Sequence, residues 1–328
     1  MTGGAGFIGS HMVDRLIKEK HEVIVIDNES TGSRDNVNPS ADYIRGDVTQ
    51  PEDLDKVFRK KPEVVFHIAG QGSIIKSFTE PERDLSVNVV GTIHVVKKCL
   101  QYQVPRLLYA SSMMVYGNPK TTPVPESEPC VPISYYGITK YAAERFVLTT
   151  AERPDLDFKL LVTSFRMFSV YGERQSLTNP YQGVVAIFIG NALRNETITI
   201  YSDGKQSRDF IHISDVVEAW VQAIDHPATY GQVFNLGTGK PCSVNEVADL
   251  TLTAFGRSRN DYSVVYGPER PGDQRCMAAD ITRVREVLNW VPKIPFRQGM
   301  PATIRWAANQ DRLAPRSHRQ NAATNPKT

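Results

Sequence analysis

A glycine-rich turn at the start of the chain constrains its fold more than any other feature. Gly3, Gly6 and Gly9 recur at every third position, a helical stretch follows, and the next apolar run ends in Asp27. Glycines let the backbone approach a phosphate closely, and the helix N-terminus attracts anions through its unpaired amides and its dipole. The order of turn, helix and acid-ended strand predicts the first unit of a dinucleotide-binding fold.

Predicted strands and helices alternate through the first half of the chain. Four apolar runs predict buried strands, at residues 22–27, 64–68, 107–110 and 158–165. Three helical patterns lie among them, at residues 10–20, 51–59 and 87–101. This alternation predicts an α/β protein with a Rossmann-like, doubly wound parallel sheet that helices cover on both faces.

The alternation breaks after Phe168, and the sequence there predicts a second, smaller α/β lobe. Prolines, a polar loop and short strands such as 198–201 follow, and a strand at 233–236 returns toward the main sheet. The two lobes therefore interleave in sequence. We predict a dinucleotide-binding domain of residues 1–168 and about 207–237, a second lobe of residues 169–206 and 238–310, and a flexible polar tail at 311–328.

The first strand of such a fold is nearly missing. Only Met1 and Thr2 precede the glycine turn, where about five apolar residues should form a central strand. We expect the recorded start to lie inside the true reading frame. The alternative is that a shorter strand suffices.

Composition excludes several classes of function. The net charge is +2 and basic residues are scattered, which argues against nucleic-acid binding but permits small phosphorylated ligands. The four cysteines show neither metal-ligand spacing nor disulfide density, so we expect no metal site and a reducing cytoplasm. The longest apolar stretch, 184–189, is too short to span a bilayer, and no signal peptide is visible. We expect a soluble cytoplasmic enzyme.

Tyr136 and Lys140 are the strongest candidates for chemistry. Four residues apart on a predicted helix, they share one face, and Ser112 ends the strand before them, where it can bond a substrate oxygen. A cation beside a phenol favours phenolate, so the pair can act as a general base. Lowering a tyrosine pKa from about 10 to near 7 takes roughly 4 kcal/mol, which the ammonium and a positively charged nicotinamide would supply together. The pattern indicates redox chemistry at an alcohol carbon; the alternative is an amphipathic surface pair.

Asp27 indicates which dinucleotide the site prefers. Its carboxylate would accept hydrogen bonds from both adenosine ribose hydroxyls and repel a 2′-phosphate, so we predict NAD over NADP. Arg34 in the same loop keeps NADP open as an alternative. Asp47 ends the next strand and is placed either to reach the adenine or to be a solvated turn residue.

Small residues close the strand at 64–68. Ala69 and Gly70 would let the ribose of a cofactor pass close to the backbone. His67 before them is interpreted as a hydrogen-bonded core histidine rather than as a catalyst.

Two arginines are the best candidates for holding the phosphates of a ligand. Arg208 precedes an aspartate, and Arg270 lies in a Pro-Gly loop with Asp273. Arginine binds phosphate through a rigid fork, and the loop fixes its position. The alternative is that these residues form surface salt bridges.

Five motifs together resemble the extended short-chain dehydrogenase/reductases, and among them the nucleotide-sugar epimerases and dehydratases of the UDP-glucose 4-epimerase kind. The motifs are TGGAGFIGSH at 2–11, SSMMVYG at 111–117, YGITK at 136–140, RDFIH at 208–212 and NLGTG at 235–239. The resemblance covers residues 1 to about 308. It implies a Rossmann-like domain that binds NAD, a lobe that binds a sugar nucleotide such as a UDP-hexose, and a homodimer formed through helices around 88–103 and 137–150.

The resemblance also implies a set of site residues. Those expected to be catalytic are Tyr136, Lys140 and Ser112. Those expected to bind the cofactor are Gly3, Gly6, Phe7, Ile8, Gly9, Asp27, Asn28, Asp47, Val48, Ala69, Gly70, Asn88, Ser111, Tyr136, Lys140 and Phe168. Those expected to bind the substrate are Ser112, Tyr136, Ser169, Arg208, Arg270 and Asp273.

Two methionines separate the chemistries within this family. Dehydratases carry an acidic pair, or a glutamate at the second position, where this chain has Met113 and Met114, and NAD-dependent UDP-glucuronate decarboxylases tend to carry that glutamate. Methionine can neither remove nor deliver a proton, so elimination lacks its acid and base. C4 epimerisation of a nucleotide sugar through a 4-keto intermediate needs no such residue and is our preferred hypothesis.

Several alternatives stay open at this point. The same fold serves 4-ketoreductases, which consume NAD(P)H, and a non-catalytic NAD-responsive binding protein is a third possibility. The family commonly carries asparagine where Ser169 stands, which implies weaker or water-bridged phosphate contact there. Met277 occupies a position that influences room for an N-acetyl group, and its flexible, intermediate bulk leaves glucose, N-acetylglucosamine and glucuronate sugars open.

Overall fold

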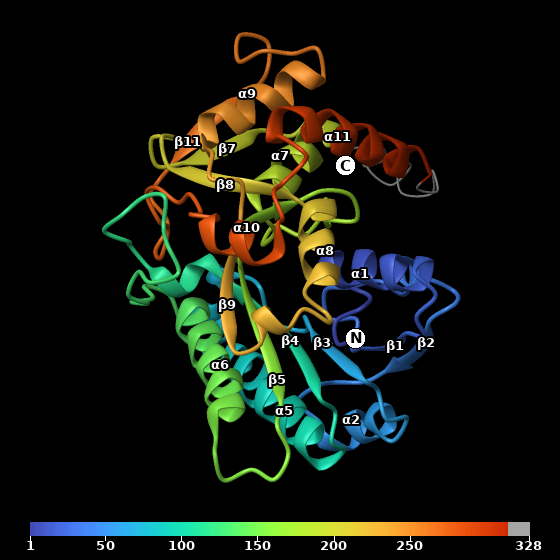
Figure 1. Ribbon diagram of the computed structural model, residues 1–328. Helices are drawn as coiled ribbons and strands as arrows, with labels where there is room; N and C mark the ends of the chain where they lie inside the picture. The colour runs from blue at the N-terminus through green and yellow to red at the C-terminus, as the bar shows by residue number, and fades with distance from the viewer. Residues whose placement is uncertain (314–328) are drawn as a thin grey trace.

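The computed structural model describes residues 1–313, and its larger lobe is built on a parallel sheet, as predicted (Figure 1). Four strands lie in the order β3-β4-β5-β9, and β1 pairs with β2 beside them, all in parallel. The strands are β1 (Ile24–Asp27), β2 (Asp42–Arg45), β3 (Val64–His67), β4 (Arg106–Ser112), β5 (Leu161–Met167) and β9 (Gln232–Leu236).

The first two residues of the chain occupy the place of the predicted central strand. Thr2 forms parallel bridges to Ile26 of β1 and to His67 of β3. The backbone amide of Thr2 donates to the Phe66 carbonyl at 2.9 Å, and the amino group of Met1 donates to the Ile24 carbonyl at 2.8 Å. This short stretch therefore joins β1 and β3 and leads directly into the glycine turn.

Helices cover both faces of the main sheet. Trp220 of α8 stacks on Phe66 of β3, with 6.2 Å between ring centroids, and α1 lies on the same face. Val65, the preceding residue, points to the opposite face and joins the core formed with α2, α5 and α6, because neighbouring strand residues alternate (Figure 1). The helices are α1 (Phe7–Lys18), α2 (Pro51–Phe58), α3 (Ile74–Thr79), α4 (Pro81–Leu85), α5 (Gly91–Gln101), α6 (Tyr135–Glu152) and α8 (Ile213–Gln222), with short turns of helix at η1 (Arg34–Asn36), η2 (Ser86–Val90), η3 (Met113–Tyr116) and η4 (Pro227–Thr229).

The smaller lobe has two short sheets and its own core. One sheet has the order β10-β8-β6, and the other pairs β7 with β11. Phe188, Phe210 and Val247 meet in the core between them. The elements are β6 (Ser169–Tyr171), β7 (Ile198–Tyr201), β8 (Ser207–His212), β10 (Pro241–Ser243), β11 (Val264–Gly267), α7 (Val184–Arg194), α9 (Val244–Ala254), α10 (Thr282–Leu288) and α11 (Phe296–Leu313).

The chain returns to the larger lobe through α8 and β9. Strand β8 pairs with β6 and β10, so residues 207–212 belong to a sheet of the smaller lobe, although we placed the return at about 207. Helix α11 continues to Leu313, so the first residues of the predicted tail are helical. The rest of that tail, 314–328, lies outside the described residues.

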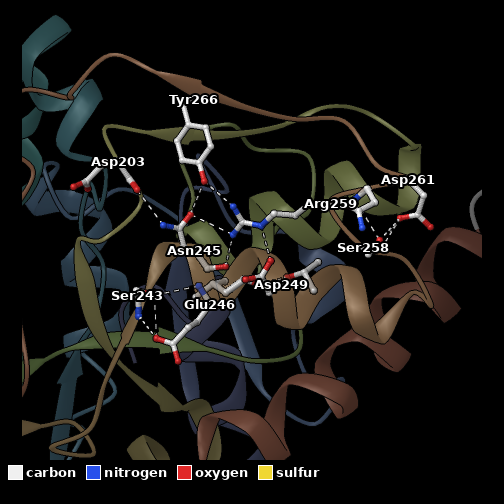
Figure 2. A network of polar contacts seen from close by, with 12 residues as sticks. Asp203, Ser243, Asn245, Glu246, Asp249, Ser258, Arg259, Asp261 and Tyr266 are labelled. Carbon is white, nitrogen blue, oxygen red and sulfur yellow. Dashed lines mark hydrogen bonds and ion pairs between the residues drawn. The ribbon is translucent and has the colours of Figure 1, made fainter.

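A surface network ties α9 to β11 in the smaller lobe (Figure 2). The guanidinium of Arg259 donates to Asp249 at 2.6 Å, to the Tyr266 hydroxyl at 2.6 Å and to the Asn245 carbonyl at 2.9 Å. Exposed pairs of this kind contribute about 0–1 kcal/mol each, so the apolar core contributes most of the stability of the lobe.

Within residues 1–313, none of the helices combines the length and the apolar character that crossing a lipid bilayer requires.

Candidate active site

A cavity of about 840 Å³ lies where the strands of the main sheet end, and both lobes line it. The larger lobe contributes the glycine turn and the ends of β1, β3 and β4, and the smaller lobe contributes the loop 174–182 and part of α11. Most of the predicted cofactor residues line this cavity: Gly3, Gly6, Phe7, Ile8, Gly9, Asp27, Asn28, Asp47, Val48, Ala69, Gly70, Ser111, Tyr136 and Lys140.

The glycine turn leaves no room for side chains. A Cβ at Gly9 would lie 2.1 Å from the Gly3 carbonyl oxygen, and one at Gly3, whose φ is +74°, would lie 2.7 Å from the backbone nitrogen of Ala69. Gly6 caps α1 without a side chain that could accept from the first amides of the helix. These amides therefore remain available to an anion, which is the arrangement that a dinucleotide pyrophosphate requires.

Asp27, which we predicted to bind the adenosine ribose, lines this cavity. Its carboxylate accepts from the backbone amides of Ala5 at 3.0 Å and Glu29 at 2.7 Å, and burial raises its pKa. Each oxygen keeps a further lone pair for a hydroxyl donor. Arg34 stacks on Tyr43 with its guanidinium carbon 4.2 Å from the ring centroid. It therefore points its charge at an aromatic face of the protein.

Asp47 orders the neighbouring loop. Its carboxylate accepts from the Asn28 side-chain amide at 2.7 Å and from the Thr49 backbone amide at 2.8 Å. These contacts fix both predicted residues at the cavity wall, where Asp47 keeps acceptor capacity for an adenine amino group.

Two of the predicted catalytic residues, Tyr136 and Lys140, line the cavity, and the third, Ser112, lies behind its wall. Helix α6 begins after Ser134, whose hydroxyl caps it, so Tyr136 lies in the first turn and Lys140 one turn further. Lys140 donates to the Ala110 carbonyl, and its ammonium lies 4.5 Å from the ring centroid of Tyr109. The Ser112 hydroxyl accepts from the Met114 backbone amide at 3.2 Å, and its proximity to Tyr136 lowers the pKa of the phenol. The surface-pair alternative is therefore excluded, because Lys140 is buried.

Burial sets the charge states of this pair. It raises the pKa of Tyr136 to about 12 against the smaller, opposing effect of the Ser112 hydrogen bond, and it lowers the pKa of Lys140 to about 8. Forming phenolate at pH 7 would then take about 7 kcal/mol, more than the roughly 4 expected from an ordinary tyrosine. Lys140 does not by itself offset the effect of burial on the Tyr136 pKa. The positive charge of a bound cofactor would therefore have to supply most of the stabilisation of the phenolate.

One hydroxyl in the cavity has no partner within the protein. The Ser111 Oγ is buried and unbonded among the described residues, and Ser111 lines the cavity beside Tyr136 and Lys140. A buried hydroxyl without a partner costs free energy unless a ligand supplies one. Together with the glycine turn and Asp27, it shows that the residues present fit a dinucleotide.

Two predicted cofactor residues lie behind the cavity wall. Asn88 is buried, and its side-chain amide forms two hydrogen bonds with the main chain of Gln71. Its Oδ1 accepts from the Gln71 amide at 2.9 Å, and its Nδ2 donates to the Gln71 carbonyl at 3.1 Å. Phe168 packs in an apolar cluster with Met113 and Tyr116. Both residues support the wall instead of lining it.

Of the predicted substrate residues, Tyr136 lines this cavity, whereas the other five do not: Ser112, Ser169, Arg208, Arg270 and Asp273. Arg208 pairs with Asp273 and donates to the Gln274 carbonyl at 2.6 Å, whereas Arg270 lies 3.4 Å from the ring centroid of Tyr201. Ser169 begins β6. The salt-bridge alternative describes Arg208 in this structure, and substrate contact by these residues stays a prediction.

The methionines that separate the chemistries are buried. Met113 and Met114 directly follow Ser112 in the sequence, and they lie in one apolar cluster with Met277. Their surroundings are therefore apolar as well.

His67 is a core residue, as interpreted. Its two ring nitrogens bond the hydroxyls of Thr2 at 2.8 Å and Thr92 at 2.9 Å, and burial lowers its pKa to about 3. Among residues 1–310, no cluster of His, Cys, Asp and Glu is suited to hold a metal ion.

Sequence reasoning missed the cavity residues that the smaller lobe supplies. Arg174 donates through Nη2 to Asp14 of α1 at 2.6 Å, while its buried Nη1 has no partner among the described residues and Arg174 lines the cavity. Trp306 and Gln310 of α11 line it as well. The only signal in the sequence was the polar character of the loop after Tyr171.

A Rossmann-type sheet, a dinucleotide cavity and a Tyr-Lys-Ser set beside it define an enzyme of the short-chain dehydrogenase/reductase type. The chain belongs to the NAD dependent epimerase/dehydratase family, whose model matches residues 1–237. It is 36% identical to a putative UDP-glucose 4-epimerase of Methanocaldococcus jannaschii, over 95% of this chain and 99% of that protein.

Two solved structures show the same likeness. The UDP-glucose 4-epimerase of Thermotoga maritima with UDP-glucose is 37% identical, with a TM-score of 0.89 over 94% of this chain and 98% of that one. The Thermus thermophilus UDP-glucose 4-epimerase in complex with NAD is 32% identical, with a TM-score of 0.86 over 96% and 98%. The resemblance to this family and the prediction of an NAD-dependent epimerase are confirmed.

Proposed function

We propose that this enzyme epimerises a UDP-hexose at C4, with UDP-glucose and UDP-galactose as the leading pair. The observation that carries the proposal is that Tyr136 and Lys140 line the dinucleotide cavity with Ser112 close to the Tyr136 phenol. Ser112 is followed in sequence by two buried methionines, where related dehydratases carry acids. Two similar proteins are named UDP-glucose 4-epimerase, which supports a UDP-hexose as the substrate.

Tyr136, Ser112 and Lys140 have different roles in the transfer of a proton from the 4-hydroxyl of the sugar. The chemistry that NAD supplies when bound is reversible acceptance of a hydride from the alcohol carbon. Tyr136 removes the proton of the 4-hydroxyl, and Ser112 hydrogen-bonds the same oxygen. Lys140 places a positive charge beside the ionising phenol. After the 4-keto sugar has turned in the site and C4 has been reduced on its other face, Tyr136 returns the proton to O4, so that C4 has the opposite configuration.

The loss of water or of CO₂ is disfavoured by the same site. Those reactions need a group that removes or delivers a proton near C5 or C6. Met113 and Met114 cannot do so, and their buried cluster leaves them in apolar surroundings. Reduction of a 4-keto sugar remains the competing activity, and it differs by consuming coenzyme.

The proposal is tested by product analysis without added coenzyme. Purified protein that carries its own NAD should bring UDP-glucose and UDP-galactose to equilibrium. The Tyr136→Phe variant should keep NAD and lose nearly all turnover. A 4,6-dehydrated product, or turnover only with added NAD(P)H, would overturn the proposal, and UDP-N-acetylglucosamine and UDP-glucuronate in the same panel establish the sugar.

We further propose a homodimer through α6 and the segment that packs beside it. Leu85, Val90, Ile138 and Phe146 are large apolar side chains that remain exposed on α4, η2 and α6. Apolar exposure of this extent on neighbouring helices is typical of an interface. Light scattering of the purified protein should give the mass of a dimer, and a monomer at micromolar concentration would contradict this.

We place the enzyme in the cytoplasm. All four cysteines lie within the described residues, and each is a free thiol. Free thiols without disulfides suit a reducing compartment.

A further inference from the structure

A buried carboxylate close to the catalytic helix has no part in the proposed chemistry. Asp84 of α4 is 0% exposed, and among the described residues it forms no ion pair. Its carboxylate accepts from the Thr139 hydroxyl at 2.6 Å, the Gln71 side-chain amide at 2.7 Å and the Asn88 side-chain amide at 3.2 Å. A buried charge is costly unless its surroundings compensate it, so this residue calls for an explanation.

The donors to Asp84 belong to the two walls of the active site. Thr139 directly precedes Lys140 in α6, and its hydroxyl also donates to the Tyr136 carbonyl at 3.1 Å. Gln71 lines the cavity, and Asn88 holds its main chain. Asp84 therefore joins the catalytic helix to the cavity wall through one side chain.

Two carboxylates, Glu144 and then Asp84, raise the pKa of Lys140, and of these two Asp84 has no ion-pair partner among the described residues. On α6, Glu144 is buried but pairs with Arg166 of β5 at 2.6 Å, and Tyr136 is a neutral phenol. From β3, His67 is neutral because burial lowers its pKa to about 3. From β4, Tyr109 presents only its ring and Ala110 only its carbonyl.

We propose that Asp84 is a positioning residue that holds α6 in register with the cavity wall through Thr139 and Gln71 and adds its negative charge to that of Glu144 near Lys140. The inference rests on the proposed function only for its kinetic consequence. The negative charge of Asp84 raises the pKa of both Lys140 and Tyr136. Removing this charge should therefore move both titrations to lower pH.

The substitution Asp84→Asn removes the charge and can keep the hydrogen bonds. The new amide oxygen can accept from Gln71 and Asn88, and the new amide can donate to Thr139, which still donates to the Tyr136 carbonyl. Glu82→Gln is the matched control, because it removes an exposed carboxylate from the same short helix.

We expect the pH profile of kcat/KM to shift toward acid on both limbs in Asp84→Asn, by about one unit. The NAD content after purification should equal that of the wild type, and Glu82→Gln should leave the profile unchanged. Superimposable profiles for Asp84→Asn and wild type, with equal NAD content, would overturn the proposal. A residue with a purely structural role would lower the rate or the stability without moving the limbs.

A second readout does not depend on turnover. Titration of the NAD-loaded protein by near-ultraviolet phenolate absorbance, with Tyr136→Phe subtracted, isolates the Tyr136 transition. We expect this transition to lie at lower pH in Asp84→Asn. The shift would support the inference even if no nucleotide sugar were epimerised, whereas its absence would reject the inference even in an active enzyme.

A third variant decides the matter if Asp84→Asn does not fold. Thr139→Val keeps the carboxylate and removes its 2.6 Å bond to α6. We expect a fall in NAD content or in kcat with the limbs of the profile in place. Unchanged NAD content and unchanged kcat would reject the positioning role.

Discussion

Replacing Gly9 by alanine tests whether the glycine turn is the cofactor cradle. The new Cβ would lie 2.1 Å from the Gly3 carbonyl oxygen, 2.8 Å from its carbon and 2.9 Å from the Gly4 Cα. Ordinary contacts between carbon and a carbonyl oxygen begin at about 3.3 Å, so the turn would have to move by about 1 Å. These are backbone atoms, which cannot rotate out of the way. Overpacking of this kind costs about 2 kcal/mol, or roughly thirtyfold in Kd if the cost falls on NAD binding.

The assay is the Kd of NAD for protein stripped of its cofactor, measured by calorimetry together with Tm. Gly72→Ala is the matched control, since Gly72 also lines the cavity but a Cβ there meets no atom within 4 Å. We expect Gly9→Ala to weaken NAD binding by one to two orders of magnitude and Gly72→Ala to change it less than threefold. Equal affinity in Gly9→Ala and wild type, with both folded, would refute the assignment of the turn.

Three further predictions follow from the electrostatics of the buried groups. Arg174→Ala should weaken NAD binding roughly tenfold in the same calorimetric assay, because it removes a buried guanidinium nitrogen, Nη1, that has no acceptor among the described residues and is free to contact the cofactor. Unchanged affinity would count against a contact between Arg174 and NAD. Glu144→Gln should lower the free energy of unfolding, measured in urea, by about 3–5 kcal/mol, because it leaves the buried Arg166 without the carboxylate now 2.6 Å away. The control Asp155→Asn, in an exposed pair, should lower it by less than about 1 kcal/mol. The rate should fall as pH rises through about 8, because burial lowers the pKa of Lys140 to that value and only its protonated form supports the phenolate; a rate that stays flat to pH 10 would contradict this role.

The sequence predicted those features that local chemistry decides. Strand β7 has the predicted bounds of 198–201, and β9 begins one residue earlier than expected, at Gln232. The glycine turn, Asp27 and the Tyr136–Lys140 pair all lie at the cavity because each is fixed by spacing along one element. Periodicity and turn chemistry are properties of neighbouring residues, so they are readable without a structure.

Features that depend on contacts between distant segments were not predictable. Arg174 and Trp306 line the cavity although no sequence pattern connects them to the glycine turn. Asn88 has the residue type of a ligand contact, yet burial turns its amide toward the main chain of Gln71. The pKa of Tyr136 is set mainly by desolvation, which depends on the packing around the phenol. The roughly 4 kcal/mol that we expected for forming phenolate from an ordinary tyrosine was therefore too low.

Isotope labelling at C4 tests the central chemistry most directly. UDP-glucose deuterated at C4 is incubated in ordinary water with the protein and no added coenzyme, and the product is resolved by NMR. We expect UDP-galactose that retains deuterium at C4, and, in the converse experiment in heavy water, no deuterium at C5. Loss of the C4 label to solvent, or solvent deuterium at C5, would contradict transient oxidation at C4 with a retained cofactor and with Tyr136 as the base.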